Sequence, residues 1–219
     1  MHTHQKKFTL IELLVVISII SLLISILLPA LGAARASARS IQCASNQRGL
    51  GVIISLYAED NNMYYPTAML PVNRTWQEFL GVTYMSISSK YPTWQDGKRP
   101  LKTFACPDSQ QVMSAGNKAD YGMNWRICND TSDSKRVDSF VNPTEIVLTV
   151  DSVGRSLVYW GNNPNIMGME GRHKNGVAKT DERNIVNVLY CDGHVTTTAM
   201  KELLYPSASS AFNIRPWQP

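Results

Sequence analysis

The chain lacks a block of like charge, a catalytic motif and a second long apolar run. Its 219 residues carry a formal net charge of +4, but the lysines and arginines are scattered, which argues against nucleic-acid binding. There is no Gly-x-Ser-x-Gly, no His-Glu-x-x-His and no phosphate-binding glycine loop, so the sequence indicates no enzyme and no cofactor. What remains is one apolar run and enough further chain for one globular domain.

The apolar run covers residues 8–28, and Glu12 is its single ionisable side chain. A helix of this length would be roughly 31 Å long at 1.5 Å per residue, which matches the hydrocarbon thickness of a bilayer. A carboxylate inside a bilayer costs on the order of 2.5–3.5 kcal/mol, so Glu12 is a functional candidate by default. The sequence therefore predicts a transmembrane helix over residues 8–29.

The residues around Glu12 resemble a known processing signal. Two lysines precede the sequence Phe-Thr-Leu-Ile-Glu at residues 8–12, a pattern similar to the N-terminal cleavage and methylation signal of type IV prepilins and type II secretion pseudopilins. The resemblance implies that residues 1–7 are a leader peptide, that prepilin peptidase cuts between Lys7 and Phe8, and that Phe8 is then methylated. One residue departs from the family pattern, because glycine usually stands where this chain has Lys7.

The same resemblance gives roles to Glu12 and Pro29. Glu12 would align neighbouring subunits during assembly, and Pro29 would bend the helix. The implied partners are prepilin peptidase, other pilin or pseudopilin subunits, the assembly platform of the bacterial inner membrane and membrane lipid. The N-terminus would lie in the cytoplasm and the globular domain outside it. The implied function is a structural subunit of a type II secretion pseudopilus or a type IV pilus-like filament that supports protein secretion.

Other interpretations of the run stay open. Lys6, Lys7 and the small residues 32–34 could belong to a secretory signal peptide, although the apolar core of such a peptide has about 7–15 residues and no acid. The run could also be a plain membrane anchor in which Glu12 has no role. The alternative function is a membrane-anchored extracytoplasmic domain that binds a ligand or performs metal-dependent hydrolysis with His173, Asp192 and His194.

Helical composition continues beyond Pro29. Residues 30–45 are rich in alanine, serine and arginine, and good helix formers of this kind would extend the span out of the bilayer. Apolar residues then recur with the i, i+3, i+4, i+7 spacing of an amphipathic helix, at Leu50, Ile53, Ile54 and Tyr57. The pattern predicts one helix over residues 8–58, whose extracytoplasmic part covers 30–60 and whose solvated face carries Arg35, Arg39 and Arg48.

Beyond the helix, the sequence predicts a globular domain over residues 61–205 and a surface tail over 206–219. Apolar β-rich runs cover residues 145–150, 156–160, 185–191 and 194–198, and Asp192-Gly193 predicts a two-residue type I′ turn between the last two. Three or four antiparallel strands would pack on the apolar stripe of the helix. The predicted fold is α+β and pilin-like, with a long N-terminal helix on a small antiparallel sheet.

Residues 67–142 show little periodicity, and the sequence predicts loops there with a helical turn at 76–80. Their aromatic residues are interpreted as core, namely Trp76, Tyr84, Tyr91 and Trp94. The segments Phe-Ala-Cys-Pro-Asp at 104–108 and Tyr-Gly-Met-Asn at 121–124 resemble pilin-like proteins that end in a His…Asp-Gly-His region. A short helix at 200–204 closes the predicted domain.

His173, Asp192 and His194 are candidates for a metal site, because histidine and aspartate are both competent ligands. Their spacing matches no zinc pattern, and a turn already explains Asp192-Gly193, so a structural role is the interpretation preferred. The related proteins have a shorter spacing than the 18 residues that separate His173 from Asp192 here, which makes residues 177–183 an insertion. Calcium is a further candidate, because residues 129–133 offer oxygen ligands without a recognisable cage.

Four cysteines follow the apolar run, on the side that the resemblance places outside the cytoplasm: Cys43, Cys106, Cys128 and Cys191. An even number in an oxidising compartment could form two disulfides with three connectivities. Four free, buried thiols are the alternative. The sequence does not decide between these arrangements.

Overall fold

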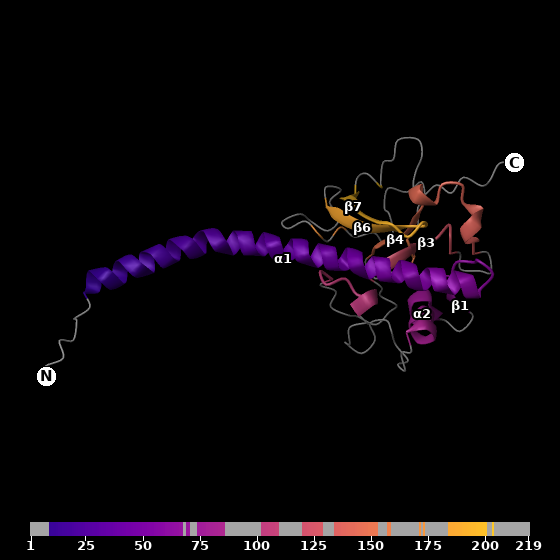
Figure 1. Cartoon of the computed structure of the whole chain (residues 1–219), viewed down its shortest axis with the longest axis horizontal. Coiled ribbons are helices and arrows are strands. Elements are labelled where there is room, and N and C mark those ends of the chain that lie inside the picture. The colour runs from indigo at the N-terminus through magenta and orange to yellow at the C-terminus, as the bar shows by residue number, and fades with distance from the viewer. Residues whose placement is uncertain are drawn as a thin grey trace.

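The structure, a computed structural model, describes residues 9–67, 69–70, 74–85, 102–109, 120–128, 134–152, 157–158, 171, 173, 184–200 and 203. One long helix, α1 (Leu10–Asp60), carries a small α+β head at its C-terminal end (Figure 1). The predicted cleavage bond between Lys7 and Phe8 lies outside the described residues. The same holds for the predicted calcium loop at 129–133, the insertion at 177–183, the aromatic residues Tyr91 and Trp94, and the tail.

A capping box starts α1. The hydroxyl of Thr9 accepts a hydrogen bond from the backbone N–H of Glu12 (3.3 Å), and the Glu12 carboxylate accepts one from the backbone N–H of Thr9 (2.9 Å). Two of the donors that a helix start leaves unpaired are thereby satisfied. This local pairing explains why the helix starts at Leu10.

The helix continues without a break for 51 residues, and Pro29 lies inside it. Figure 1 shows that its N-terminal half is curved. A proline lacks the N–H for the i−4 bond and crowds the preceding turn, so Pro29 supplies a physical cause for the curvature. α1 ends at Asp60, which agrees with the predicted extracytoplasmic part at 30–60, and Asn62 and Met63 just beyond it adopt positive φ angles of 54° and 66°.

The two halves of α1 differ in burial. The large apolar side chains between Leu10 and Leu31 are exposed, and α1 is long and apolar enough to cross a membrane. The second half buries one stripe at helical spacing, consisting of Cys43, Ala44, Gln47, Leu50, Gly51, Ile54, Tyr57 and Ala58. The predicted apolar stripe is thus confirmed, and it faces the head.

The head contains a five-stranded sheet whose order is β5 (Leu157–Val158), β3 (Tyr121–Asn124), β4 (Val147–Asp151), β6 (Ile185–Tyr190) and β7 (Val195–Ala199). The four strands from β3 to β7 pair antiparallel, which agrees with the predicted α+β layout. Two features differ from the prediction. β3 is a strand that the sequence did not indicate, and β5 pairs parallel with β3.

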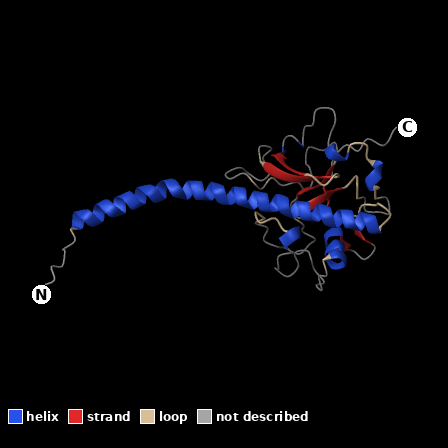
Figure 2. Cartoon of the chain, viewed as in Figure 1, coloured by secondary structure: helices blue, strands red, loops and turns tan. Residues whose placement is uncertain are grey.

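The C-terminal half of α1 runs between the sheet and a group of short elements (Figure 2). These include β1 (Met69–Leu70), β2 (Arg74–Thr75), α2 (Trp76–Tyr84) and the 3-10 turn η1 (Lys102–Phe104). Two further 3-10 turns, η2 (Val137–Ser139) and η3 (Pro143–Glu145), precede β4. The predicted helical turn at 76–80 is confirmed and is longer than expected.

Aromatic side chains join α1 to these elements. The ring of Tyr57 contacts Phe79 and Tyr84 edge to face, at 5.8 and 6.3 Å between centroids, and the fully buried Trp76 contacts Phe104. The core role predicted for Trp76 is therefore confirmed, whereas Tyr84 is partly buried and packs at the edge of the core. A second buried cluster, made mainly of valines, contains Met200 and Leu203. Both residues are helical and lie within 200–204, where the sequence predicted a closing helix.

The β6–β7 hairpin differs from its predicted turn. Its loop has three residues, Cys191 to Gly193, and the N–H of Gly193 donates to the carbonyl of Tyr190 (3.0 Å). A type I′ turn needs positive φ at both central residues, but within this loop only Gly193 has it, at 89°. The turn is instead the three-residue kind that ends with a left-handed glycine.

Gly51 allows α1 to approach β6 closely, and replacing it should weaken the head. A Cβ atom there would lie 3.1 Å from Cδ1 of Leu189, so Gly51→Leu should destabilise the protein by about 1–3 kcal/mol through overpacking. Thermal unfolding of the detergent-solubilised chain measures the effect. The control is Gly49→Ala, whose Cβ would make an ordinary 3.4 Å contact with Thr103, so it should stabilise the helix by about 0.5–1 kcal/mol. Equal unfolding temperatures for the two variants would contradict the close approach.

Candidate functional site

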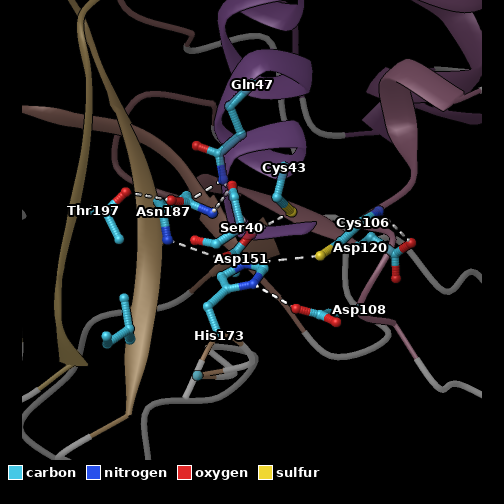
Figure 3. A network of polar contacts seen from close by, with 12 residues as sticks. Ser40, Cys43, Gln47, Cys106, Asp108, Asp120, Asp151, His173, Asn187 and Thr197 are labelled. Carbon is cyan, nitrogen blue, oxygen red and sulfur yellow. Dashed lines mark hydrogen bonds and ion pairs between the residues drawn. The ribbon is translucent and has the colours of Figure 1, made fainter. Parts of the chain in front are cut away.

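A buried group of ionisable side chains lies between α1 and the sheet (Figure 3). It consists of Cys43, Cys106, Asp151 and His173, whose ligand atoms all lie within 4.8 Å of one another. The side chains of Asp151 and His173 have no exposed surface, and Cys43 and Cys106 are buried as well. Within the described part of the chain, these four side chains form the cluster of histidine, cysteine and acidic residues that could hold a metal ion.

Four separate segments supply these residues. Cys43 lies on the buried stripe of α1, one turn before Gln47. Asp151 ends β4, and Cys106 follows η1 with its N–H donating to the carboxylate of Asp120 (3.0 Å). The N–H of His173 donates to the carbonyl of Ile185 (3.3 Å), which holds it beside the start of β6. The cluster therefore exists only when the helix, the sheet and two connecting segments have come together.

Specific contacts link the four side chains. Nε2 of His173 lies 3.1 Å from Oδ2 of Asp151 and 3.8 Å from Sγ of Cys106. The thiol of Cys43 donates to Oδ1 of Asp151 over 3.6 Å. Asp151 is thus the centre of the group, with one oxygen toward the histidine and the other toward the helix.

A second layer of polar groups orients the first. Nδ1 of His173 donates to Asp108 (2.9 Å), which also pairs with Arg39, so Arg39 is not on the fully solvated face that the sequence predicted. Asp151 accepts from the side chain of Gln47 (3.2 Å) and the N–H of Asn187 (2.8 Å). The lone pairs of the buried carboxylate are therefore satisfied by several donors.

Burial controls the proton affinities in the cluster. It raises the pKa of the Cys43 thiol far above its ordinary value, and the adjacent Cys106 and Asp151 act in the same direction. Burial opposes the charged form of His173, but hydrogen bonding to Asp151 and Cys106 outweighs it and raises the histidine pKa to about 10. These two shifts favour a protonated His173 and a neutral Cys43 thiol.

The three residues proposed from the sequence as a metal site do not come together. His173 belongs to the buried cluster, whereas Asp192 and His194 lie at the β6–β7 turn and pair with each other, at 27% and 40% side-chain exposure. His194 also stacks on Tyr190, with 4.3 Å between ring centroids. The groove beside this turn is lined by Gly193 and Cys191 but by none of the three side chains. The alternative of a hydrolytic or binding site built from them loses its geometric basis.

Sequence reasoning found His173 but did not indicate Asp151 as its partner. The available signal was a polar residue at the end of an apolar strand, Val-Leu-Thr-Val-Asp, which is also common where a strand simply ends. Cys43 carried a clearer signal. It lies seven residues before Leu50, which puts it on the same face of the helix as the predicted apolar stripe.

All four cysteines are free thiols in the structure, and Cys128 and Cys191 lie outside the cluster. Burial raises the pKa of the Cys191 thiol to about 12 and raises that of Cys128 as well. Neither thiol is activated as a nucleophile, because reactive cysteines have lowered pKa values. Two disulfides, which the sequence left open beside four free thiols, stay a prediction.

The N-terminal candidates have a different environment. Glu12 is exposed on the first turn of α1, where its carboxylate accepts a hydrogen bond from the backbone N–H of Thr9. Around it lies a continuous exposed surface of leucine, isoleucine and valine.

No family model, no curated protein and no solved structure matches the chain.

Proposed function

We propose that the chain is a pilin-like structural subunit, anchored in the bacterial inner membrane and assembled into a type II secretion pseudopilus or a type IV pilus-like filament that supports protein secretion. One observation carries the proposal. A single helix of 51 residues is exposed and apolar in its first half and buried against a folded head in its second half. A subunit that moves from a bilayer into a helical filament core needs this arrangement.

The exposed half of α1 requires an apolar environment. Side chains such as Leu10, Ile11 and Leu22 are 86%, 75% and 63% exposed, and a soluble monomer rarely carries so large an apolar surface. Lipid satisfies this surface before assembly, and the equivalent helices of other subunits satisfy it afterwards. Because the helix does not break at the head, movement of one end moves the other.

Glu12 fits the same proposal. Removal of residues 1–7 would make Phe8 the first residue and put a positive amino group one helical turn before the carboxylate. Both charges then lie in apolar surroundings, where an unpaired charge is costly. Pairing between the carboxylate of one subunit and the amine of its neighbour lowers that cost and sets the axial register of the two helices.

Processing of the N-terminus tests the proposal. Chain purified from bacterial membranes that contain prepilin peptidase should begin with N-methylated Phe8, as read by intact mass and N-terminal sequencing. Lys7→Gly, which restores the usual family residue, should be cut at the same bond at least as completely. A start near Ala33 would instead establish a secretory signal peptide, and an intact N-terminus in both variants would establish a plain anchor.

A further inference from the structure

We propose that Cys43, Cys106, Asp151 and His173 bind one zinc ion that fastens the long helix to the head. The four ligand atoms are two sulfurs, one oxygen and one nitrogen, a set that suits zinc in tetrahedral geometry. This assignment goes beyond the proposed function, because assembly into a filament does not by itself imply a zinc site. It also differs from the metal candidates of the sequence, since only His173 is shared.

The ligand separations fit one small ion. With Zn–S near 2.3 Å and Zn–N or Zn–O near 2.1 Å, a tetrahedral zinc ion places its ligand atoms roughly 3.4–3.8 Å apart. The observed separations are 3.8 Å from Cys106 Sγ to His173 Nε2 and 3.6 Å from Cys43 Sγ to Asp151 Oδ1. The distance from His173 Nε2 to Asp151 Oδ2 is 3.1 Å. Cys43 and His173 face different oxygens of Asp151, and the ligand atoms all lie within 4.8 Å of one another, so the side chains would have to close in by up to about 1 Å around the ion.

The surrounding contacts are those of a metal site. Histidine ligands of zinc commonly donate their other ring N–H to a carboxylate, and Nδ1 of His173 donates to Asp108 at 2.9 Å. The hydroxyl of Tyr121 lies 3.1 Å from Sγ of Cys43, and Asn187 and Gln47 donate to Asp151. Each of these donors can stabilise negative charge on a ligand. Because Nδ1 of His173 is bound to Asp108, Nε2, which faces Cys106 and Asp151, is the ring nitrogen that would bind the ion.

Charge and protons balance in simple terms. Two thiolates, one carboxylate and a neutral imidazole carry three negative charges, which Zn²⁺ reduces to one. Binding displaces the protons of both thiols and the proton on Nε2 of His173, and these pass to water. The remaining negative charge is distributed over ligands that accept hydrogen bonds from Gln47, Asn187 and Tyr121.

The site would be structural. Four protein ligands leave no position for water or substrate, and the ligands are all buried. They come from α1, the segment after η1, the end of β4 and the segment beside β6, so one ion would join four parts of the head that the sequence keeps far apart.

The metal content of the full chain tests the inference. Protein purified in detergent should contain about one zinc per chain by mass spectrometry of the elements, as expected for a closed four-ligand site. Cys43→Ser and Cys106→Ser should each lose the zinc, whereas Cys128→Ser and Cys191→Ser should retain it. Co²⁺ added to metal-free protein should give the intense visible bands and the thiolate charge-transfer band of tetrahedral cobalt, in the wild type and in the two control variants.

If a variant fails to fold, measurements on the wild type alone still test the proposal. Zinc removal by a chelator should lower its unfolding temperature, and added Zn²⁺ should restore it. Asp108→Asn, which retains all four ligands, should weaken zinc affinity about 10–100-fold. The assignment would be overturned if the folded wild type contained no zinc, or if its metal-free form gave no tetrahedral cobalt spectrum with Co²⁺. So would a Cys43–Cys106 disulfide in a non-reducing peptide map, or zinc that depends on Cys128 or Cys191.

Discussion

Glu12→Leu is expected to abolish incorporation of the chain into filaments while cleavage before Phe8 and membrane insertion remain intact. The substitution removes the single ionisable group of the apolar run, so insertion becomes easier. In the proposed filament, the amino group of Phe8 in the neighbouring subunit would then have no carboxylate partner in an apolar environment. Breaking a buried ion pair in this way costs about 3–5 kcal/mol for each contact, enough to stop assembly at every step.

A second variant separates the charge of Glu12 from its role in the helix start. Glu12 also accepts hydrogen bonds from Thr9, and glutamine at the same position can form the same capping box without a charge. Glu12→Gln should therefore retain the helix start and still fail to assemble. The measurement is the amount of processed chain in filaments sheared from cells, compared with the amount left in membranes. Normal assembly of the glutamine variant would assign Glu12 to helix capping, and normal assembly of the leucine variant would remove it from assembly altogether.

Asp151→Ala is expected to unfold the head. The carboxylate accepts hydrogen bonds from the side chains of Gln47 and His173 and from the N–H of Asn187, and its side chain is fully buried. In the metal-free protein, alanine leaves these donors without a partner and leaves the charge of His173 uncompensated on that side; in the zinc-bound protein it removes one ligand of the ion. The expected loss is about 3–5 kcal/mol, a large part of the 5–15 kcal/mol that stabilises a typical domain.

The matched control for Asp151 is an exposed aspartate. Asp138 pairs with Arg136 at 2.6 Å, with side chains 55% and 44% exposed, and such surface pairs contribute about 0–1 kcal/mol. Asp138→Ala should accordingly leave the unfolding temperature nearly unchanged. Near-ultraviolet circular dichroism and protease resistance report on the head, because the apolar half of α1 remains helical in detergent. Similar unfolding of the two variants would show that the buried network does not hold the head together.

The long helix could be predicted from the sequence because its signals are local. A continuous apolar run, alanine-rich composition and the spacing of Leu50, Ile54 and Tyr57 each depend on residues a few positions apart. β6 and β7 were predicted for the same reason, since the two strands of a hairpin follow each other directly in the sequence. The type of their turn was not, because register rather than the Asp-Gly pair decides which residue takes positive φ.

The missed parts of the fold depend on distant pairings. β3 has four residues, one of them glycine, and it becomes a strand because β4 and β5 pair with it from later in the chain. The buried cluster has the same origin. His173 is 22 residues from Asp151 and 67 from Cys106, so no spacing in the sequence could reveal that they meet.

The unpacked stretch of α1 between its two apolar regions would set the clearance of the head above a bilayer. No residue between Pro29 and Ala36 is buried, whereas beyond Ala36 the helix contacts the head, because Arg39 pairs with Asp108 and the carbonyl of Ser40 accepts a hydrogen bond from the side chain of Asn187. The stretch from Pro29 to Ala36 rises about 10 Å along the helix axis. If residues 8–29 lie in lipid, as proposed, the head would stand about one nanometre above the surface. A subunit could then be drawn back toward the membrane by about two helical turns before its head met the lipid, and this travel would limit the stroke over which a neighbouring copy can engage it.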